Sequence, residues 1–266
     1  CYPIFADGPR IAGAELYYMP LQKENDYVIQ LQDIPEEIAR KAKFMLVSYP
    51  NNPTAAMAPE SFYHEVVAFA KKYDIIVLHD NAYSELVFDG QSCGSFLSIP
   101  GAMEVGVEFN SLSKTYGLAG ARIGFCVGNK EVVGMLKTLK SNMDYGMFLP
   151  IQAAAVEALT GNQAVVAETR AAYEHRRDVL CDGLIEAGWH MEKPAGTMFV
   201  WAPIPDSYQD SESFVADLLD KTGVLVTPGS AFGPSGEGYV RMALVQSEDT
   251  MKKIVEAVAV SGIFDK

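Results

Sequence analysis

Short apolar runs alternate with longer amphipathic segments over the first two thirds of the chain. FMLVS (44–48), IIVL (75–78) and the runs at 105–109 and 123–127 are mostly apolar along their length. Such runs are typical of strands buried on both faces. Segment 59–73 instead places apolar side chains on one face of a helix. The alternation predicts an α/β fold with a mostly parallel sheet between two layers of helices, a three-layer αβα arrangement.

The spacing changes toward the end of the chain, where the predicted elements become shorter. Asn162 is expected to cap a long helix that Gly188 closes, and a soft boundary falls inside it. We therefore predict a large domain over 1–172 and a smaller α+β domain over 173–266. The other predicted helices are 35–43, 131–141, 150–160, 211–221 and 249–260, and the other predicted strands are 14–18, 197–202, 224–227 and 239–245.

Composition and charge narrow the functional classes. Of 266 residues, 49% are hydrophobic and 21% charged, as in an ordinary globular protein. The net charge of -13 argues against nucleic acid and anionic membrane surfaces as partners, and no apolar run is long enough for a membrane span. The four cysteines form no C-x-x-C pair and the four histidines show no metal spacing. We expect a cytoplasmic protein without a metal.

Polar residues follow three of the predicted strands at the end where ligands bind in open α/β sheets. Together they offer an amide, a carboxylate, a phenol, hydroxyls and an amine. Pyridoxal phosphate needs such a set: its aldehyde forms a Schiff base with a lysine, its ring nitrogen needs a carboxylate, and its phosphate needs hydroxyls and an arginine. The residues are Asn52, Asp80, Tyr83, Ser111, Ser113 and Lys114.

Four stretches in this order resemble the class I aminotransferases of pyridoxal-phosphate fold type I, above all the subgroup of LL-diaminopimelate and aspartate aminotransferases. They are YPNNPT (49–54), HDNAYSELVFDG (79–90), the run from 95 to 125 that contains SLSKTYGLAGARIGF, and GEGYVRMALV (236–245). The similarity extends from Tyr2 to the end of the chain.

The resemblance implies a role for each matched residue at the cofactor ring. Lys114 would form the Schiff base and carry the proton between the substrate and the cofactor, and Asp80 would pair with the ring nitrogen. Tyr83 and Asn52 would donate to the phenolic oxygen, and Tyr2 would stack on the ring. Taken alone, the lysine could be a surface residue, the aspartate a helix cap, the asparagine a turn residue and Tyr2 a packing residue.

The resemblance also implies two anion sites. Ser111, Ser113 and Arg122 would hold the cofactor phosphate, although the Ser113 hydroxyl could simply cap the turn. Arg241 lies in an apolar strand, where an unpaired charge is costly, and would clamp the substrate α-carboxylate together with Asn52. The alternative for Arg241 is a surface ion pair on an edge strand.

Three departures from the family pattern stand out. Ala55 replaces the glycine that usually follows the asparagine-proline-threonine motif, and Ala121 replaces a tryptophan before the phosphate arginine. Family members also carry about a hundred or more residues before the position of Tyr2, so the chain is expected to lack an N-terminal part that completes the phosphate site.

The resemblance implies a transaminase of amino-acid metabolism and biosynthesis that moves an amino group from an amino acid to a 2-oxo acid, acting as a homodimer. A β-lyase or decarboxylase reaction on the same fold and an inactive fragment stay open. A generic nucleotide-binding domain is disfavoured, because no G-x-G-x-x-G follows the first strand.

Overall fold

The computed structural model describes residues 2–264, and their contacts divide the chain into two compact units. One unit comprises 28–50 and 57–170. The other comprises 1–27, 51–56 and 171–266. The division within the C-terminal half therefore falls between Arg170 and Ala171. The assignment of the large and small parts to separate functional domains stays a prediction.

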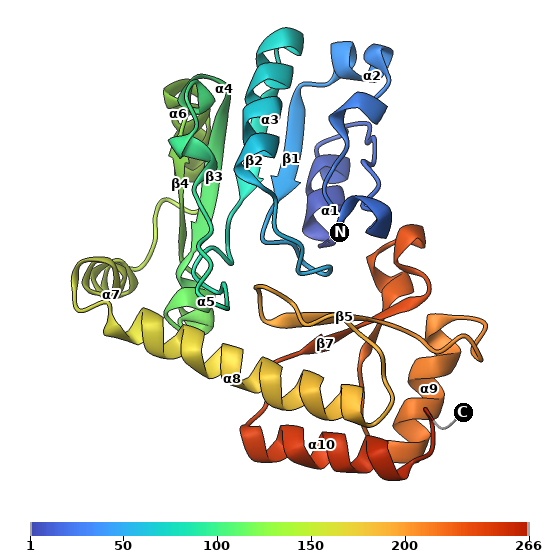
Figure 1. Ribbon diagram of the computed structural model, residues 1–266. Coiled ribbons are helices and arrows are strands. Elements are labelled where there is room, and N and C mark those ends of the chain that lie inside the picture. Colours follow the sequence, from blue (N-terminus) through green and yellow to red (C-terminus); the bar gives the residue numbers. More distant parts are fainter. Residues whose placement is uncertain (1, 265–266) are drawn as a thin grey trace. The chain divides into compact units, whose positions relative to one another are not determined.

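The first unit is built on a four-stranded sheet in the order β1-β2-β3-β4 (Figure 1). Strands β1 (Phe44–Ser48), β2 (Ile76–Asp80) and β3 (Gly106–Ser111) are parallel, which confirms the predicted α/β class. Strand β4 (Gly124–Gly128) runs antiparallel to β3. Residues 112–123 join β3 to β4, and an antiparallel return needs no crossover to the other end of the sheet.

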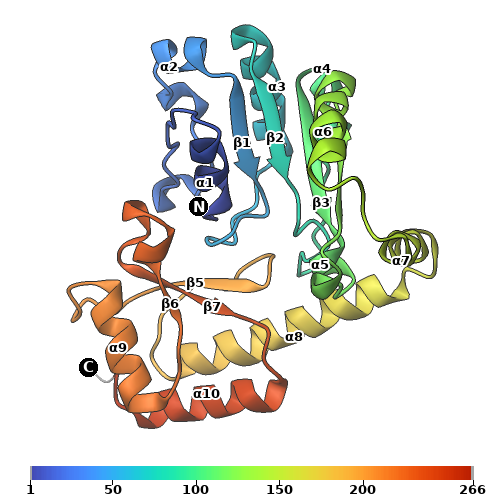
Figure 2. The same ribbon diagram turned by 180° about the vertical axis from the view of Figure 1, so that it is seen from behind.

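Helices cover both faces of this sheet, as the apolar runs predicted. Helix α3 (Glu60–Tyr73) lies on one face and α6 (Lys130–Met143) on the other, as the two opposite views in Figures 1 and 2 show. Phe62, Val66 and Ala70 form the buried stripe of α3. The other helices with residues in this unit are α2 (Glu36–Lys41), α4 (Ala102–Val105), α5 (Leu112–Thr115), α7 (Leu149–Thr160) and the first part of α8 (Ala164–Glu186).

The second unit surrounds a three-stranded antiparallel sheet in the order β5-β7-β6. Its strands are β5 (Phe199–Pro203), β6 (Thr227–Pro228) and β7 (Tyr239–Ala243). Helices α9 (Ser211–Thr222), α10 (Glu248–Val260) and the second part of α8 share one apolar core with this sheet. Leu184, Phe214, Leu218, Val240 and Leu244 are fully buried in it.

The beginning of the chain differs from the prediction. Residues 4–11 form helix α1 (Ile4–Ile11), and the predicted strand at 14–18 is irregular. Tyr17 and Tyr18 are exposed, so the hydrophobic residues of this segment do not belong to a core. The predicted strand at 224–227 is also wrong in length, because only two residues of β6 pair with β7.

Candidate functional site

The carboxyl ends of β2 and β3 bring two predicted site groups to the same edge of the larger sheet. Asp80 is the last residue of β2, and its Cα partner in β3 is Phe109. Strand β3 ends two residues later at Ser111, and the short helix α5 that carries Lys114 follows at once. The predicted carboxylate and the predicted amine therefore follow neighbouring parallel strands, where ligands bind in open α/β sheets.

Asp80 is a half-buried carboxylate with few donors around it. The Ser48 hydroxyl of β1 donates to its Oδ2 over 3.3 Å. Burial raises the pKa of Asp80 above its usual value, against smaller lowering effects from the charge of His79 and from the hydrogen bonds of Ser48 and the Ala82 amide. A cation placed against this carboxylate would reverse the effect of burial.

Lys114 lies in α5, whose start is fixed by a serine. The Ser111 hydroxyl accepts a hydrogen bond from the Ser113 amide over 3.1 Å, so Ser111 is the residue that caps this turn. The cap role that the sequence suggested for Ser113 belongs to Ser111. Lys114 itself is half-buried, and the next residue, Thr115, is buried.

Tyr83 and Arg122 lie in the same unit, in the segments that follow β2 and α5. Tyr83 is buried, and its carbonyl accepts from the Leu86 amide over 2.9 Å. Arg122 has a left-handed backbone with φ of 53°, and its exposed guanidinium donates to the Ala119 carbonyl over 3.0 Å. The phosphate role of Arg122 stays a prediction, with the side chain turned to its own loop here.

The second unit joins two further predicted residues that lie 189 positions apart. Arg241 of β7 donates through Nη1 to the Asn52 Oδ1 over 2.8 Å. The rings of Phe199 and Phe232 lie 4.2 and 4.6 Å from the guanidinium carbon. Two aromatic faces stabilise a cation that is partly removed from water. An amide oxygen and two aromatic rings therefore hold the guanidinium of Arg241.

Asn52 is buried in a tight turn that its neighbours stabilise. The Asn51 side chain accepts from the amide and the hydroxyl of Thr54, over 3.2 and 2.8 Å. Ala55, the residue that replaces the usual glycine, has a φ of 60°. The family glycine is thus explained by a left-handed position, which an alanine occupies at a cost.

Tyr2 belongs to the second unit as well, but it is not enclosed. Its side chain is 48% exposed, and its ring meets the edge of Phe5 with the centroids 5.8 Å apart. Its stacking role stays a prediction.

The structure adds a buried polar cluster that sequence reasoning missed. Glu108 of β3 is buried, and it contacts His79 of β2 on the sheet face opposite to Asp80. The sequence did contain a signal for this cluster. Glu108 stands in the apolar run VGVEFN, and burying its charge costs free energy unless the charge is paired, as for Arg241 in its strand.

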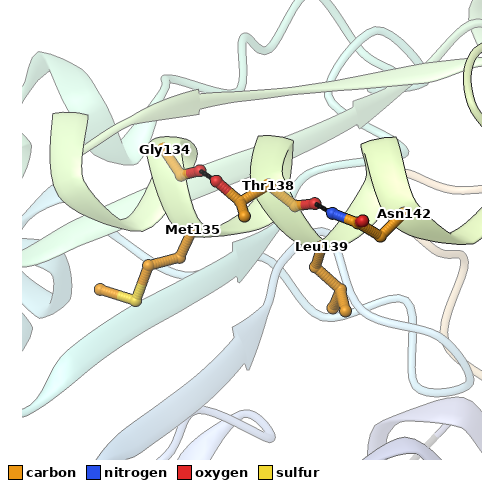
Figure 3. Close-up of a pocket in the computed structure, with 5 residues that line it drawn as sticks. All are labelled: Gly134, Met135, Thr138, Leu139 and Asn142. Atoms are coloured by element: carbon orange, nitrogen blue, oxygen red, sulfur yellow. Dashed lines mark hydrogen bonds between the residues drawn. The ribbon is translucent and has the colours of Figure 1, made fainter.

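One hollow in the surface of the first unit contains none of the predicted site residues. It is an open depression on α6, lined by Gly134, Met135, Thr138, Leu139 and Asn142 (Figure 3). Among the described residues, no group of three His, Cys, Asp or Glu side chains is placed to hold a metal ion. No helix of the described chain has the length and apolar character of a membrane span.

Comparisons with known proteins agree with this arrangement. The family model for aminotransferase class I and II matches residues 1–258. LL-diaminopimelate aminotransferases of Moorella thermoacetica and Syntrophobacter fumaroxidans are 48% and 47% identical over 255 residues, which is 96% of this chain and 65% and 66% of theirs. The chain therefore spans just under two thirds of the length of these relatives.

Solved structures show the same fold. The BacF structure from Bacillus subtilis superposes with a TM-score of 0.94 at 38% identity, covering 97% of this chain and 66% of that one. A probable N-succinyldiaminopimelate aminotransferase from Thermus thermophilus has a TM-score of 0.91 at 33% identity, with 98% and 69% covered.

Proposed function

Because the chain belongs to the aminotransferase class I and II family, we propose that it carries the cofactor and substrate groups of a transaminase that moves an amino group from an amino acid to a 2-oxo acid. The observation that carries the proposal is the placement of Asp80 and Lys114 after neighbouring parallel strands, within a family match that covers residues 1–258.

Members of this family use pyridoxal phosphate, and the donor set fits that group. Asp80 is a half-buried carboxylate whose pKa burial raises, so a cationic ring nitrogen would favour its ionised form. Lys114 supplies the amine for the aldehyde. Ser111 and Arg122 supply a hydroxyl and a guanidinium for the phosphate.

When bound, pyridoxal phosphate supplies an electron sink for the substrate Cα. The residues of the chain do the rest. Lys114 would hold and move the proton at the substrate Cα, as a half-buried amine can do. Arg241 and Asn52, which are hydrogen-bonded to each other, orient the substrate α-carboxylate, and Tyr83 and Tyr2 bind the ring.

For substrates, we propose acidic amino acids or diaminopimelate as donors and 2-oxoglutarate as acceptor, in amino-acid biosynthesis. Two relatives carry the name LL-diaminopimelate aminotransferase. We further propose a cytoplasmic homodimer. Sedimentation of the purified chain at several concentrations tests the dimer, and a single monomeric species would contradict it.

The function is tested by an amino-donor screen with the wild-type chain and Lys114→Ala. We expect a 2-oxo acid to form from the donor without release of ammonia, and the variant to lose turnover because no other group replaces the amine. Lys137→Ala, which changes an exposed lysine of α6, is the control. Transamination that persists in Lys114→Ala would refute the role of Lys114, and release of ammonia would indicate elimination.

A further inference from the structure

The carboxylate of Glu108 is hydrogen-bonded to both sequence neighbours of Asp80. His79 Nδ1 lies 3.2 Å from Oε2, and Asn81 Nδ2 donates to Oε1 over 3.1 Å. Side chains alternate along a strand, so residues 79 and 81 share one side and Asp80 has the other. Glu108 thus holds the backbone on either side of Asp80 while it leaves the Asp80 side chain on the opposite face.

The same carboxylate also anchors the end of its own strand. Asn110 donates to Glu108 Oε1 over 2.8 Å, and it directly precedes Ser111, the residue that caps α5. The Ser95 hydroxyl and the Phe96 amide donate to Oε2 over 2.8 and 2.9 Å. One side chain therefore ties together the ends of the two strands that lead to Asp80 and Lys114.

The electrostatics of this cluster require an ionised Glu108. Glu108 is 4% exposed and His79 is fully buried. Burial alone would raise the pKa of Glu108, but hydrogen bonds from His79, Asn81 and Ser95 lower it to about 2. His79 is the one basic side chain within ion-pair distance of Glu108 among residues 2–264. Its other nitrogen lies 3.3 Å from the Tyr63 hydroxyl of α3. A buried carboxylate with five donors is stiff, because each donor that lost it would be left unpaired.

We propose that Glu108 is a positioning residue of the cofactor site: its carboxylate fixes the ends of β2 and β3 relative to each other and so sets the placement of Asp80 and Lys114. The inference rests on the proposed function for what those two residues do. It does not make Glu108 a catalytic residue, because its carboxylate lies on the opposite face of the sheet from Asp80.

Four variants separate this role from general support of the fold. Glu108→Gln keeps the shape and removes the charge. Asn81→Ala removes a donor next to Asp80, and Asn110→Ala removes a donor next to Ser111. Glu104→Gln is the matched control, since Glu104 is an exposed glutamate of α4 that forms an ion pair with Lys71.

The first arm measures backbone amide exchange in the cofactor-free chain. Glu108→Gln should speed exchange at least about tenfold at residues 80–82 and 110–114. Asn81→Ala should do so in the first segment only and Asn110→Ala in the second only, while Glu104→Gln changes neither. Exchange that is unchanged at both strand ends, or that rises equally throughout the chain, would overturn the inference. If Glu108→Gln fails to fold, the two asparagine variants decide.

The second arm titrates pyridoxal phosphate by absorbance. We expect the Kd to rise about tenfold in Glu108→Gln. The pH midpoint of the bound cofactor's absorbance should also move upward. With Asp80 displaced, the ring nitrogen no longer keeps its positive charge, so the nitrogen linked to Lys114 holds its own proton to higher pH. Glu104→Gln should keep the wild-type Kd and midpoint. If the wild type binds and every variant matches it, the positioning role is overturned and the proposed function stands. If the wild type does not bind, the proposed function fails, and the exchange arm still decides the role of Glu108.

Discussion

At the scale of single residues, Ala55 in the turn that contains Asn52 adopts a backbone conformation that costs free energy for any residue but glycine. Ala55 is buried with a φ of 60°. A non-glycine residue in this region costs about 1–2 kcal/mol, whereas glycine costs about 0.5–1 kcal/mol in chain entropy. The cost of the left-handed backbone for alanine exceeds the entropy cost of glycine. The positive φ at position 55 therefore explains why the family carries a glycine there.

We expect Ala55→Gly to raise the free energy of unfolding by about 0.5 kcal/mol. The matched control is Ala56→Gly at the next position, which has no positive φ and should lose about 0.5–1 kcal/mol. Urea unfolding of the two variants measures both effects. A loss in Ala55→Gly as large as that in Ala56→Gly would show that the left-handed backbone is not strained.

The buried carboxylate of Glu108 makes a prediction about pH. Its pKa is lowered from an ordinary value of 4.5 to about 2. The stability that it contributes is therefore complete above pH 4.5 and disappears as the pH falls toward 2. In Glu108→Gln, unfolding should cost about 3 kcal/mol less at pH 7, and the difference from wild type should shrink as the pH falls from about 5 to about 2. A difference that stays constant over this range would contradict an ionised Glu108.

The residues proposed to bind the cofactor or substrate were easier to predict from the sequence than the buried residues that support them. Lys114, Asp80 and Arg241 could be proposed as site residues because they stand in motifs that resemble a known family. Glu108 and His79 have no such motif, and their pairing depends on the register between β2 and β3, in which residue 79 lies opposite residue 108. A single sequence predicts the strands, but it does not specify which residues lie side by side.

At the scale of elements, apolar runs and helical spacing predicted most of the boundaries. The strand at 44–48 and the helices α3, α8, α9 and α10 agree with the predictions within two residues. The cap of α8 is also confirmed, because the Ala164 amide donates to the Asn162 side chain over 2.9 Å. The predictions failed where hydrophobic residues are exposed, as for Tyr17 and Tyr18.

Helix α6 presents apolar side chains to solvent in the described structure. Met135 and Leu139 project from the same side of the helix (Figure 3), and they are 66% and 59% exposed. No residue of α6, which lies wholly within the described part of the chain, is buried. An exposed apolar stripe of this kind favours self-association.

We expect the double variant Met135→Gln and Leu139→Gln to leave the free energy of unfolding within about 0.5 kcal/mol of wild type, because little apolar area is lost from the core. The variant should self-associate less and bind less of a hydrophobic dye. Light scattering and dye fluorescence measure this. Thr138→Gln, on the same helix but not apolar, is the control. A loss of stability of more than about 2 kcal/mol would show that the stripe is packed.

At the scale of the whole molecule, the predicted residues fall into two groups. Asp80, Tyr83, Ser111, Ser113, Lys114 and Arg122 belong to the unit of the parallel sheet, and Tyr2, Asn52 and Arg241 to the other unit. The sequence order does not follow this division, because residues 51–56 belong with the C-terminal unit. The predicted boundary near residue 173 reflects the change of pattern along the chain. That change contains no signal that the turn at 51–56 belongs to the same unit as residues 171–266.

The central claim is that Lys114 is the amine that holds pyridoxal phosphate. The most direct measurement is to mix the wild-type chain with the cofactor, reduce the mixture with borohydride, and locate the covalently attached group by peptide mass spectrometry. We predict a single modified site at Lys114, with no attachment at that peptide in Lys114→Ala. Attachment at another lysine, or spread over many lysines with none preferred, would contradict the account.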